Sequence, residues 1–266
     1  MVQRVELRWC GFVDRVVDGE LQFADDGFRS RLDGDCYIWY PKSVENAGQG
    51  QRKSEQSQVI IAVDGPTASG KGTLAKALAA HFGLPFMDTG MLYRAVGRQT
   101  QLNGSDPDDA GDALVACDFA DGLLDDVILR SEEIGGLASR VSVHPEVRAA
   151  LNQRQVDFAN QPNGALLDGR DIGTVISPHA DVKLFVTAPA EIRARRRHAE
   201  MVARDPHVSF VHILADIHAR DERDTGRADA PLKSADDAIL LDTGDLTICA
   251  AVQAAIALVE ARLDRS

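Results

Sequence analysis

Short apolar runs alternate along most of the chain with segments of helical periodicity. The first run, 59–63, consists of valine, isoleucine and one alanine, a composition typical of a strand that is buried on both faces of a parallel sheet. Further strands are predicted at 84–88, 164–171, 182–187 and 238–244, and an additional one, VILRS, at 127–131.

Between these runs, apolar residues recur at the spacing of helices. Leu74, Leu78 and Phe82 lie four residues apart, and the glycine after Phe82 suits the end of that helix. A second helix should begin at Asp88 or Thr89, since both are good N-cap residues. Strands that alternate with helices predict an α/β fold, with a five-stranded parallel sheet flanked by helices and a site at the carboxyl ends of the strands. Further helical patterns cover 108–124, 144–158 and a C-terminal face formed by Ile248, Val252, Ile256, Val259 and Leu263.

Residues 1–58 differ from the rest of the chain. They hold both tryptophans and two of the three tyrosines, and their short alternating runs predict small strands or no stable structure. From 43 to 58 the sequence is polar, as in a linker. We therefore expect an appendage with its linker at 1–58, whose function the sequence does not reveal, and a main domain at 59–266.

The formal net charge is −12 over 266 residues. Because nucleic acids and anionic bilayers are held by an excess of Lys and Arg, this charge argues against general binding to either. The four cysteines show no metal-ligand spacing, the N-terminus has no apolar signal core, and no segment is apolar enough to span a bilayer. We expect a cytoplasmic protein whose basic groups gather in one local site.

A glycine-bounded loop, GPTASGKGT, follows the first predicted strand and precedes the first predicted helix. Side chains at Gly65 or Gly70 would block backbone amides from wrapping a polyphosphate, and the helix N-terminus adds its dipole. Lys71 then places one positive charge on the β and γ phosphates. The alternative is a glycine-rich turn before an ordinary helix. Nucleotide contacts are expected from Gly65, Pro66, Thr67, Ala68, Ser69, Gly70, Lys71, Gly72 and Thr73.

The loop ends in GKGT, so Gly72 stands where a generic phosphate-binding loop has Ser or Thr directly after the lysine. This ending resembles the nucleoside monophosphate kinases, and it makes Thr73 the candidate hydroxyl near Mg²⁺. Asp168 follows the apolar residues of the strand predicted at 164–171 and is placed to hold Mg²⁺ directly or through water. Asp64 and Asp88 are weaker candidates of the same kind.

Six motifs occur in one order over 59–266: GPTASGKGT, DTGMLYR, SRVSVHPEVR, DGRDIGTV, an arginine-rich segment and ARDERDTGR. In these motifs the chain resembles the bacterial cytidylate kinase family. The resemblance implies Mg²⁺-dependent transfer of a phosphoryl group from ATP to CMP and dCMP by a monomer. It also implies a CMP-binding insert at about 101–145 and a helical lid at about 190–232.

The resemblance assigns acceptor contacts residue by residue. The hydroxyls, the carboxylate and the guanidinium at the base positions match cytosine, which offers an exocyclic amine beside ring acceptors. For each arginine alone a surface ion pair is the alternative, and for Tyr93 it is core packing. The implied contacts are Arg94, Arg170 and Arg227 to the phosphate, Thr89, Ser139, Arg148 and Asp171 to the base, and Tyr93, Arg220 and Asp224 to the ribose.

The run EIRARRRHAE places Arg193, Arg196 and Arg197 three and four residues apart, on one side of a helix. This run resembles the family's lid, so these arginines, with Lys71 and Arg170, are the candidate catalytic cations. A solvated helix face is the alternative.

One departure from the family pattern and two alternative functions belong beside this interpretation. The stretch between Arg94 and Arg148 looks shorter than the family's usual insert, with the missing part before Leu137. A UMP or AMP kinase of the same fold is the first alternative, and the Arg148 and Asp171 pair discriminates against it. A nucleotide-dependent binding module is the second, but the sequence contains neither NKxD nor LSGGQ.

Overall fold

The computed structural model describes the backbone of residues 15–17, 20–22, 27–33 and 36–41, and all atoms of residues 58–203 and 206–265. Contacts divide the chain into two units, 1–53 and 54–266. In the first unit, β1 (Arg15–Val17) pairs antiparallel with β2 (Glu20–Gln22), and β3 (Gly27–Asp33) pairs antiparallel with β4 (Cys36–Pro41). Nearly all of the predicted linker lies outside the described residues.

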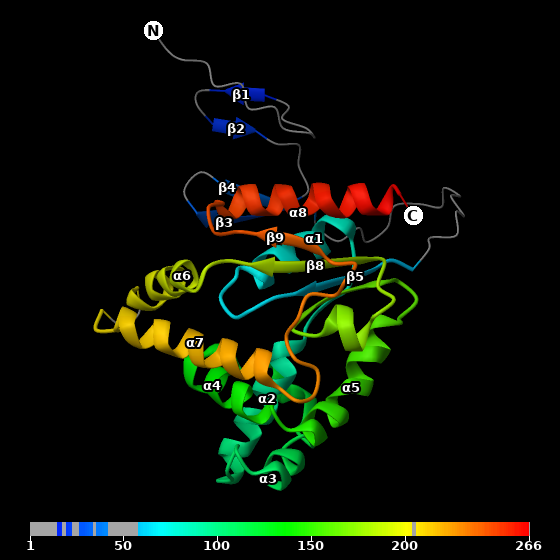
Figure 1. The fold of residues 1–266 in the computed structure, drawn as a ribbon. Helices are drawn as coiled ribbons and strands as arrows, with labels where there is room; N and C mark the ends of the chain where they lie inside the picture. Colours follow the sequence, from blue (N-terminus) through cyan, green and yellow to red (C-terminus); the bar gives the residue numbers. More distant parts are fainter. Residues whose placement is uncertain are drawn as a thin grey trace. The chain divides into compact units, whose positions relative to one another are not determined.

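The second unit is built on a five-stranded parallel sheet (Figure 1). Its strand order is β6-β7-β5-β8-β9, with β5 in the centre and buried along its whole length. The predicted α/β architecture is confirmed. The strands are β5 (Ile60–Asp64), β6 (Phe86–Asp88), β7 (Ala165–Gly169), β8 (Val182–Thr187) and β9 (Ile239–Asp242).

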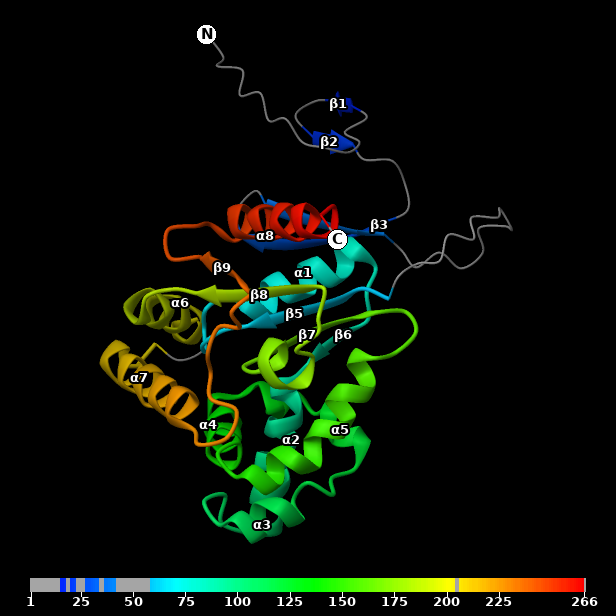
Figure 2. The ribbon, with the colours of Figure 1, turned by 45° about the vertical axis from the view of Figure 1, so that its right-hand side comes forward.

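Helices cover both faces of the sheet (Figures 1 and 2). The helices α1 (Lys71–Phe82) and α8 (Ile248–Leu263) pack together on one face. On the other face lie α5 (Pro145–Ala159) and the π-helical turn η3 (Ile172–Ile176). Two layers of helix around one sheet leave the carboxyl ends of the strands as the open edge where a site forms.

The predicted end of α1 and start of α2 are confirmed. Leu74 and Leu78 are buried in α1, and Gly83 ends that helix in the left-handed conformation, with φ of 64°. The next helix, α2 (Thr89–Asn103), begins directly after β6. The Oδ1 atom of Asp88 accepts a hydrogen bond from the Gly90 amide at 3.0 Å, which caps it. In α8 the buried face holds alanines 251 and 255 beside Val252 and Val259, whereas Ile248 is exposed.

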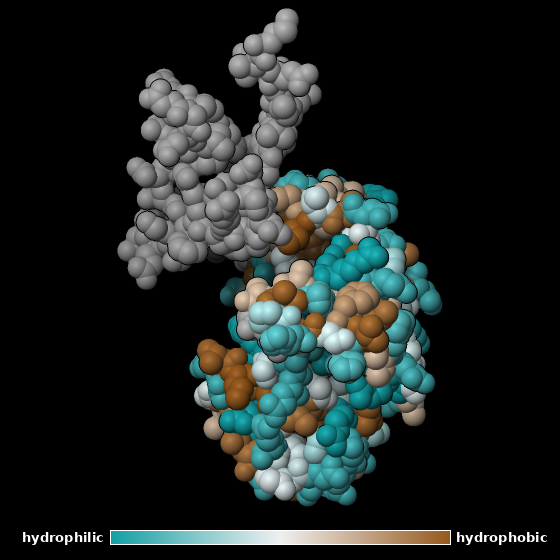
Figure 3. Space-filling model, turned by 90° about the vertical axis from the view of Figure 1, so that its left-hand side faces the viewer, coloured by the Kyte–Doolittle hydropathy of each residue, from teal (hydrophilic) through white to brown (hydrophobic). Residues whose placement is uncertain are grey.

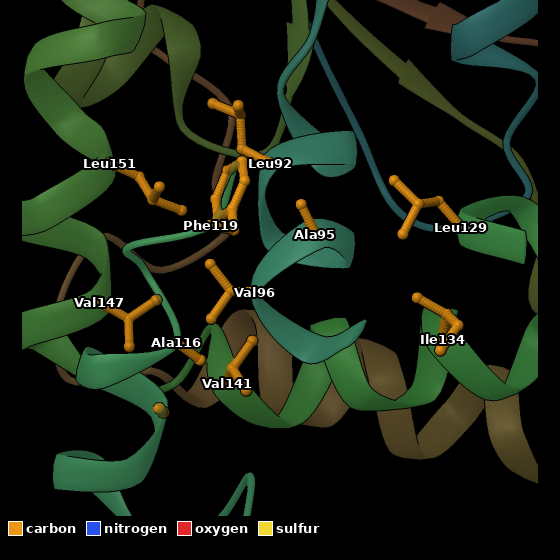
Figure 4. Packing of buried hydrophobic residues seen from close by; sticks show 11 residues of the cluster. Leu92, Ala95, Val96, Ala116, Phe119, Leu129, Ile134, Val141, Val147 and Leu151 are labelled. Atoms are coloured by element: carbon orange, nitrogen blue, oxygen red, sulfur yellow. The ribbon is translucent and has the colours of Figure 1, made fainter. Parts of the chain in front are cut away.

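The segment after α2 forms a helical insert with a core of its own (Figure 4). Leu92 and Val96 of α2 face Leu151 and Val141 across this core. This core holds the insert against α2 and α5, and Met87 of β6 also packs against it. The insert's elements are α3 (Ala110–Val115), the 3₁₀ turns η1 (Asp121–Asp125) and η2 (Val127–Arg130), and α4 (Glu132–Val141).

The prediction of a strand at 127–131 is wrong, because this segment is the 3₁₀ turn η2. The Asp126 side chain accepts from the Ile128 amide at 3.0 Å, and the Ser131 amide donates to the Ile128 carbonyl at 2.9 Å. This local capping competes with strand pairing. Leu129 alone of the run is buried, whereas Val127 is 83% exposed.

Two helices after β8 form a hairpin, α6 (Ala190–Val202) and α7 (Phe210–Gly226). Their small core joins Ala194 to Ile213 and Ile217, and Ala68 of the glycine-bounded loop packs against it. The hairpin therefore contacts the loop that is predicted to bind phosphate.

No helix in the described part of the chain combines the length and the apolar character that crossing a membrane requires. Figure 3 shows one face of the second unit, on which hydrophilic residues cover most of the surface and hydrophobic ones form smaller groups.

Candidate active site

The backbone of the loop between β5 and α1 depends on glycines at two positions. Gly65 has φ of 154°, and a Cβ atom there would lie 2.0 Å from the carbonyl oxygen of Val186. Gly70 has φ of 86° and directly precedes α1. Ala68 also adopts a positive φ, of 57°, although it carries a side chain. A loop of this shape exposes backbone amides beside a helix N-terminus, which is the arrangement that binds polyphosphates.

Lys71 and Asp168 meet at the carboxyl edge of the sheet. The Lys71 Nζ atom lies 3.7 Å from Oδ1 of Asp168, and both side chains are largely buried. Burial lowers the pKa of Lys71. Burial also raises the pKa of Asp168 to about 6, although Lys71 opposes that rise. A buried carboxylate with so few partners favours binding of an additional cation.

The surroundings of Asp168 fit Mg²⁺ better than those of the other candidates. Its Oδ1 is buried without a hydrogen-bond partner, and a Cβ atom at Gly72 would lie 3.2 Å from its Oδ2. Thr73 is exposed in the first turn of α1. Both oxygens of Asp64 already accept backbone amides, and Asp88 caps α2. The described residues contain no group of three His, Cys, Asp or Glu side chains able to hold a metal ion, so nucleotide phosphates would have to complete its coordination.

The raised pKa of Asp168 gives a testable pH dependence. Because the folded-state pKa, about 6, exceeds the ordinary 3.8, the folded protein binds the proton more tightly than the unfolded chain. This group's contribution to stability is therefore present at low pH and is lost as the pH rises from about 4 to 6. Without nucleotide, the unfolding free energy of the wild type should fall relative to that of Asp168→Asn by about 2–3 kcal/mol over this interval. Urea unfolding at several pH values measures it, and a pH-independent difference would contradict it.

A carboxylate flanked by two arginines lies beside the loop. Asp224 of α7 accepts from Arg170 Nε at 2.8 Å and from Arg227 Nη2 at 3.0 Å. Burial opposes ionisation of Asp224, but the two arginines outweigh it and hold its pKa below the usual value. Arg170 directly follows β7 and Arg227 directly follows α7, so the fold brings these two predicted phosphate contacts together on Asp224, the predicted ribose contact.

Arg94 faces the same region from α2. Its Nη1 donates to the carbonyl oxygens of Leu129 and Ser131, at 2.6 and 2.8 Å. Burial lowers its pKa to about 10, so it remains charged at neutral pH. A Cβ atom at Gly135 would lie 2.8 Å from its Nη2. Main-chain carbonyls of the insert thus orient the Arg94 guanidinium. Gly135 leaves space for this group, which a larger residue would displace.

A hollow of about 150 Å³ is lined by residues of α2, α5 and η3. Tyr93, Arg148 and Asp171 line it, as do Asn152 and Asp229. Arg148 Nη2 donates to Oδ2 of Asp171, and the Arg148 guanidinium lies 5.7 Å from the centre of the Tyr93 ring. Three residues predicted to bind the base or the ribose therefore share one pocket.

The two predicted base-contacting hydroxyls differ in their partners. Thr89 Oγ1 donates to the carbonyl oxygen of Asp168 at 2.8 Å, so it retains lone pairs that can accept. Ser139 Oγ is buried and makes no hydrogen bond with the described residues. An unpartnered buried hydroxyl is costly, which is consistent with a ligand supplying its partner.

The arginines of the hairpin are held by carboxylates, by backbone carbonyl oxygens and by a hydroxyl. Arg193 forms a double hydrogen bond with Asp221, at 2.6 and 3.0 Å, and reaches the loop carbonyl of Thr67 at 3.2 Å. Arg196 donates to Oγ1 of Thr243 at 3.0 Å. Arg197 and the predicted ribose contact Arg220 both pair with Glu132. The structure thus brings Arg197 and Arg220 together, while Arg193 joins α6 to α7 and to the loop.

Several residues of this site are absent from the sequence-based prediction. Glu132, Asp221 and Thr243 hold the hairpin arginines, and only their proximity in the fold reveals them. Asn152 could have been predicted from the sequence, because it lies one helical turn after Arg148 and therefore on the same face of α5. Its Oδ1 is buried without a hydrogen-bond partner in the described structure.

A glycine loop with a buried lysine at the carboxyl edge of a parallel sheet, faced by buried arginines, defines a P-loop phosphotransferase. The family profile described as cytidylate kinase matches residues 61–261. The chain therefore belongs to the cytidylate kinase family, and it is a kinase.

Curated relatives agree with this assignment. The cytidylate kinase of Xanthobacter autotrophicus is 55% identical over 77% of this chain and 98% of its own length. Those of Azorhizobium caulinodans and Methylocella silvestris are each 54% identical, over 76% and 77% of this chain and 98% and 96% of their own lengths. Nearly the whole length of each of these relatives is matched.

Proposed function

We propose that this protein transfers the γ-phosphoryl group of ATP to CMP and dCMP, with Mg²⁺. The observation that carries the proposal is the buried Arg148 and Asp171 pair in a pocket beside the cluster of Arg170, Asp224 and Arg227. Membership of the cytidylate kinase family supports it independently. A base-reading pair and a phosphate-binding group side by side fit a pyrimidine nucleoside monophosphate.

The pocket chemistry favours cytosine over uracil. Asp171 would accept from the exocyclic amine of cytosine, and Arg148 would donate to the ring acceptors. Uracil presents a carbonyl at the amine position, which would leave Asp171 facing an acceptor. Tyr93 closes the pocket beside Arg148, with Ser139 and Thr89 as further contacts. This arrangement predicts CMP well ahead of UMP.

Transfer itself needs positioning and charge neutralisation more than proton transfer. Lys71 and the loop amides hold the donor phosphates, while Arg94, Arg170 and Arg227 hold the acceptor phosphate. Arg193, Arg196 and Arg197 belong to the hairpin that closes over them and excludes water, which would otherwise accept the phosphoryl group. Mg²⁺ bound with ATP supplies further neutralisation of the β and γ phosphates, and Asp168 would hold it.

The direct test is ADP production by the full chain with ATP and Mg²⁺ and, in turn, CMP, dCMP, UMP and AMP. We expect turnover with CMP and dCMP, and a kcat/KM for UMP lower by about 10²-fold or more. Equal or faster turnover with UMP or AMP would assign the protein to a different acceptor. Absence of turnover with every monophosphate would refute the kinase mechanism at this site.

Residues 1–58 are proposed to be dispensable for catalysis. The loop, the arginines and the pocket all lie within 65–230, and the ion pairs described at the site join residues of this range. Deleting residues 1–55 should therefore leave kcat and KM for CMP within about twofold of the full chain. Loss of soluble protein on truncation would show that the first unit stabilises the second.

We also propose a monomer that binds no nucleic acid, in keeping with the net charge of −12.

A further inference from the structure

Asp64 is a buried carboxylate to which the mechanism above gives no role. It is the last residue of β5 and directly precedes Gly65, and it is only 5% exposed. Its Oδ1 accepts the Ile172 amide at 2.9 Å, and its Oδ2 accepts the Gly173 amide at 2.8 Å. The Asp64 carboxylate thus connects β5, which precedes the donor loop, by two hydrogen bonds to the segment after β7.

The two amides open the π-helical turn η3. Within this turn the Val175 amide donates to the carbonyl oxygen of Asp171 at 2.8 Å, and the Ser177 amide donates to that of Ile172 at 2.7 Å. Single π-helical turns are rare and occur frequently at functional sites. Here the turn begins immediately after Arg170 and Asp171, the two residues proposed to bind the acceptor's phosphate and base.

Anchoring the Ile172 amide also fixes its neighbour. The peptide unit that joins Asp171 to Ile172 is planar, so an amide held by Asp64 sets the position of the Asp171 carbonyl and, through it, of the Asp171 Cα atom. From that position Asp171 meets Arg148, and Arg170 meets Asp224 at 2.8 Å. Both ends of the arrangement are buried, which leaves little room for readjustment.

We propose that Asp64 is a positioning residue for the acceptor nucleotide, because through the Ile172 and Gly173 amides it holds Arg170 and Asp171 in their binding positions. A residue at the base of the donor loop would then determine recognition of the pyrimidine monophosphate rather than of ATP. The inference rests on the proposed function, since it assigns Asp64 a part in that same acceptor site.

The near-isosteric variant Asp64→Asn tests this proposal. An amide has one acceptor oxygen, so its NH₂ group would face one of the two backbone N–H donors and displace η3. Misplacement of a positioning group by about 1 Å costs up to about 10²-fold. We expect KM for CMP to rise by about tenfold or more and the CMP to UMP ratio of kcat/KM to narrow by a similar factor. KM for ATP should stay within about threefold.

Asp181→Asn is the matched control. The Oδ2 of Asp181 accepts the amide of Ile60 at 2.8 Å, so it makes the same kind of bond at the opposite end of β5. Because Asp181 accepts only one amide, the oxygen of an asparagine can still accept it, and this variant should leave the CMP to UMP ratio and both KM values unchanged. Thermal unfolding of both variants separates loss of folded protein from loss of acceptor recognition.

Gly173→Ala is a second test variant that leaves Asp64 in place. It tests the proposal even if Asp64→Asn fails to fold. A Cβ atom at position 173 would lie 3.1 Å from Lys183 Cδ and 3.4 Å from Oδ2 of Asp64. Lys183 cannot move away freely, because its Nζ binds the carbonyl oxygen of Pro178 at 2.6 Å and Asp237 at 2.9 Å. The displaced turn should again raise KM for CMP selectively.

Two results would overturn the proposal: an unchanged CMP to UMP ratio in the folded variants, or a rise of KM for ATP equal to that for CMP. The second would place the action of Asp64 on the donor loop or on the metal. A wild-type protein without activity on CMP would instead refute the proposed function, so the two failures are distinguishable.

Discussion

Replacing Lys71 with alanine should lower kcat with CMP by about 10²–10³-fold or more, because it removes a preorganised positive charge from the phosphoryl group in transit. The Nζ atom lies at the mouth of a loop whose backbone is shaped by Gly65 and Gly70. No other side chain in the first turn of α1 carries a positive charge. The measurement is ADP production with saturating ATP and CMP.

The matched control is Lys76→Ala, which removes an exposed lysine from the same helix. It should leave kcat unchanged. Lys71→Ala also leaves Asp168 buried without its nearest cation, so its pKa should rise further and the carboxyl should stay neutral to a higher pH. The variant should therefore remain folded, as circular dichroism would show. A folded variant with wild-type turnover would contradict the role of Lys71.

The sheet and the donor loop were predictable because they depend on local pattern. A β-branched run followed by glycines at two fixed positions and an amphipathic helix has few structural solutions, and all three elements are observed. The ends of β6 and α2 were predictable for the same reason, since Asp88 serves as a local cap. Local rules sufficed wherever the deciding contacts lie within a few residues in sequence.

The insert shows where such rules fail. VILRS has strong strand propensity, but capping by Asp126 and burial of Leu129 against α2 and α4 make it a 3₁₀ turn. Tertiary packing overrides propensity in short segments. The same limit explains why Glu132 was not identified, because its partners Arg197 and Arg220 lie far along the chain and approach only when the hairpin folds.

The predicted arginine set shows an intermediate case. Family motifs indicated which guanidinium groups matter, yet not what holds each of them before nucleotide binds. Arg94 is oriented by main-chain carbonyls, Arg170 by Asp224, and Arg193 by Asp221. These partners lie within hydrogen-bond distance of the guanidinium groups, so none of these three charged groups is buried without a partner. Nucleotide phosphates would have to compete with them, or bind the donor groups that remain free.

Replacing Arg148 with methionine should affect recognition and stability together. Arg148 and Asp171 are 7% and 5% exposed, so the substitution leaves a buried carboxylate without its partner. Removing one member of a buried pair typically costs about 3–5 kcal/mol of unfolding free energy. The loss of donors to the cytosine ring should lower kcat/KM for CMP by about 10²-fold or more. Urea unfolding and steady-state kinetics with CMP and UMP measure the two effects.

Two further variants separate these effects. Arg154→Met removes an arginine from the exposed face of the same helix, where it pairs with Asp121 at 2.6 Å, and it should change neither property by much. The double variant Arg148→Met with Asp171→Asn removes both charges, so it should recover much of the lost stability without recovering CMP recognition. Stability and specificity would then diverge within one pair of residues. If folded Arg148→Met kept the wild-type ratio of kcat/KM for CMP and UMP, the cytosine would have to be bound elsewhere.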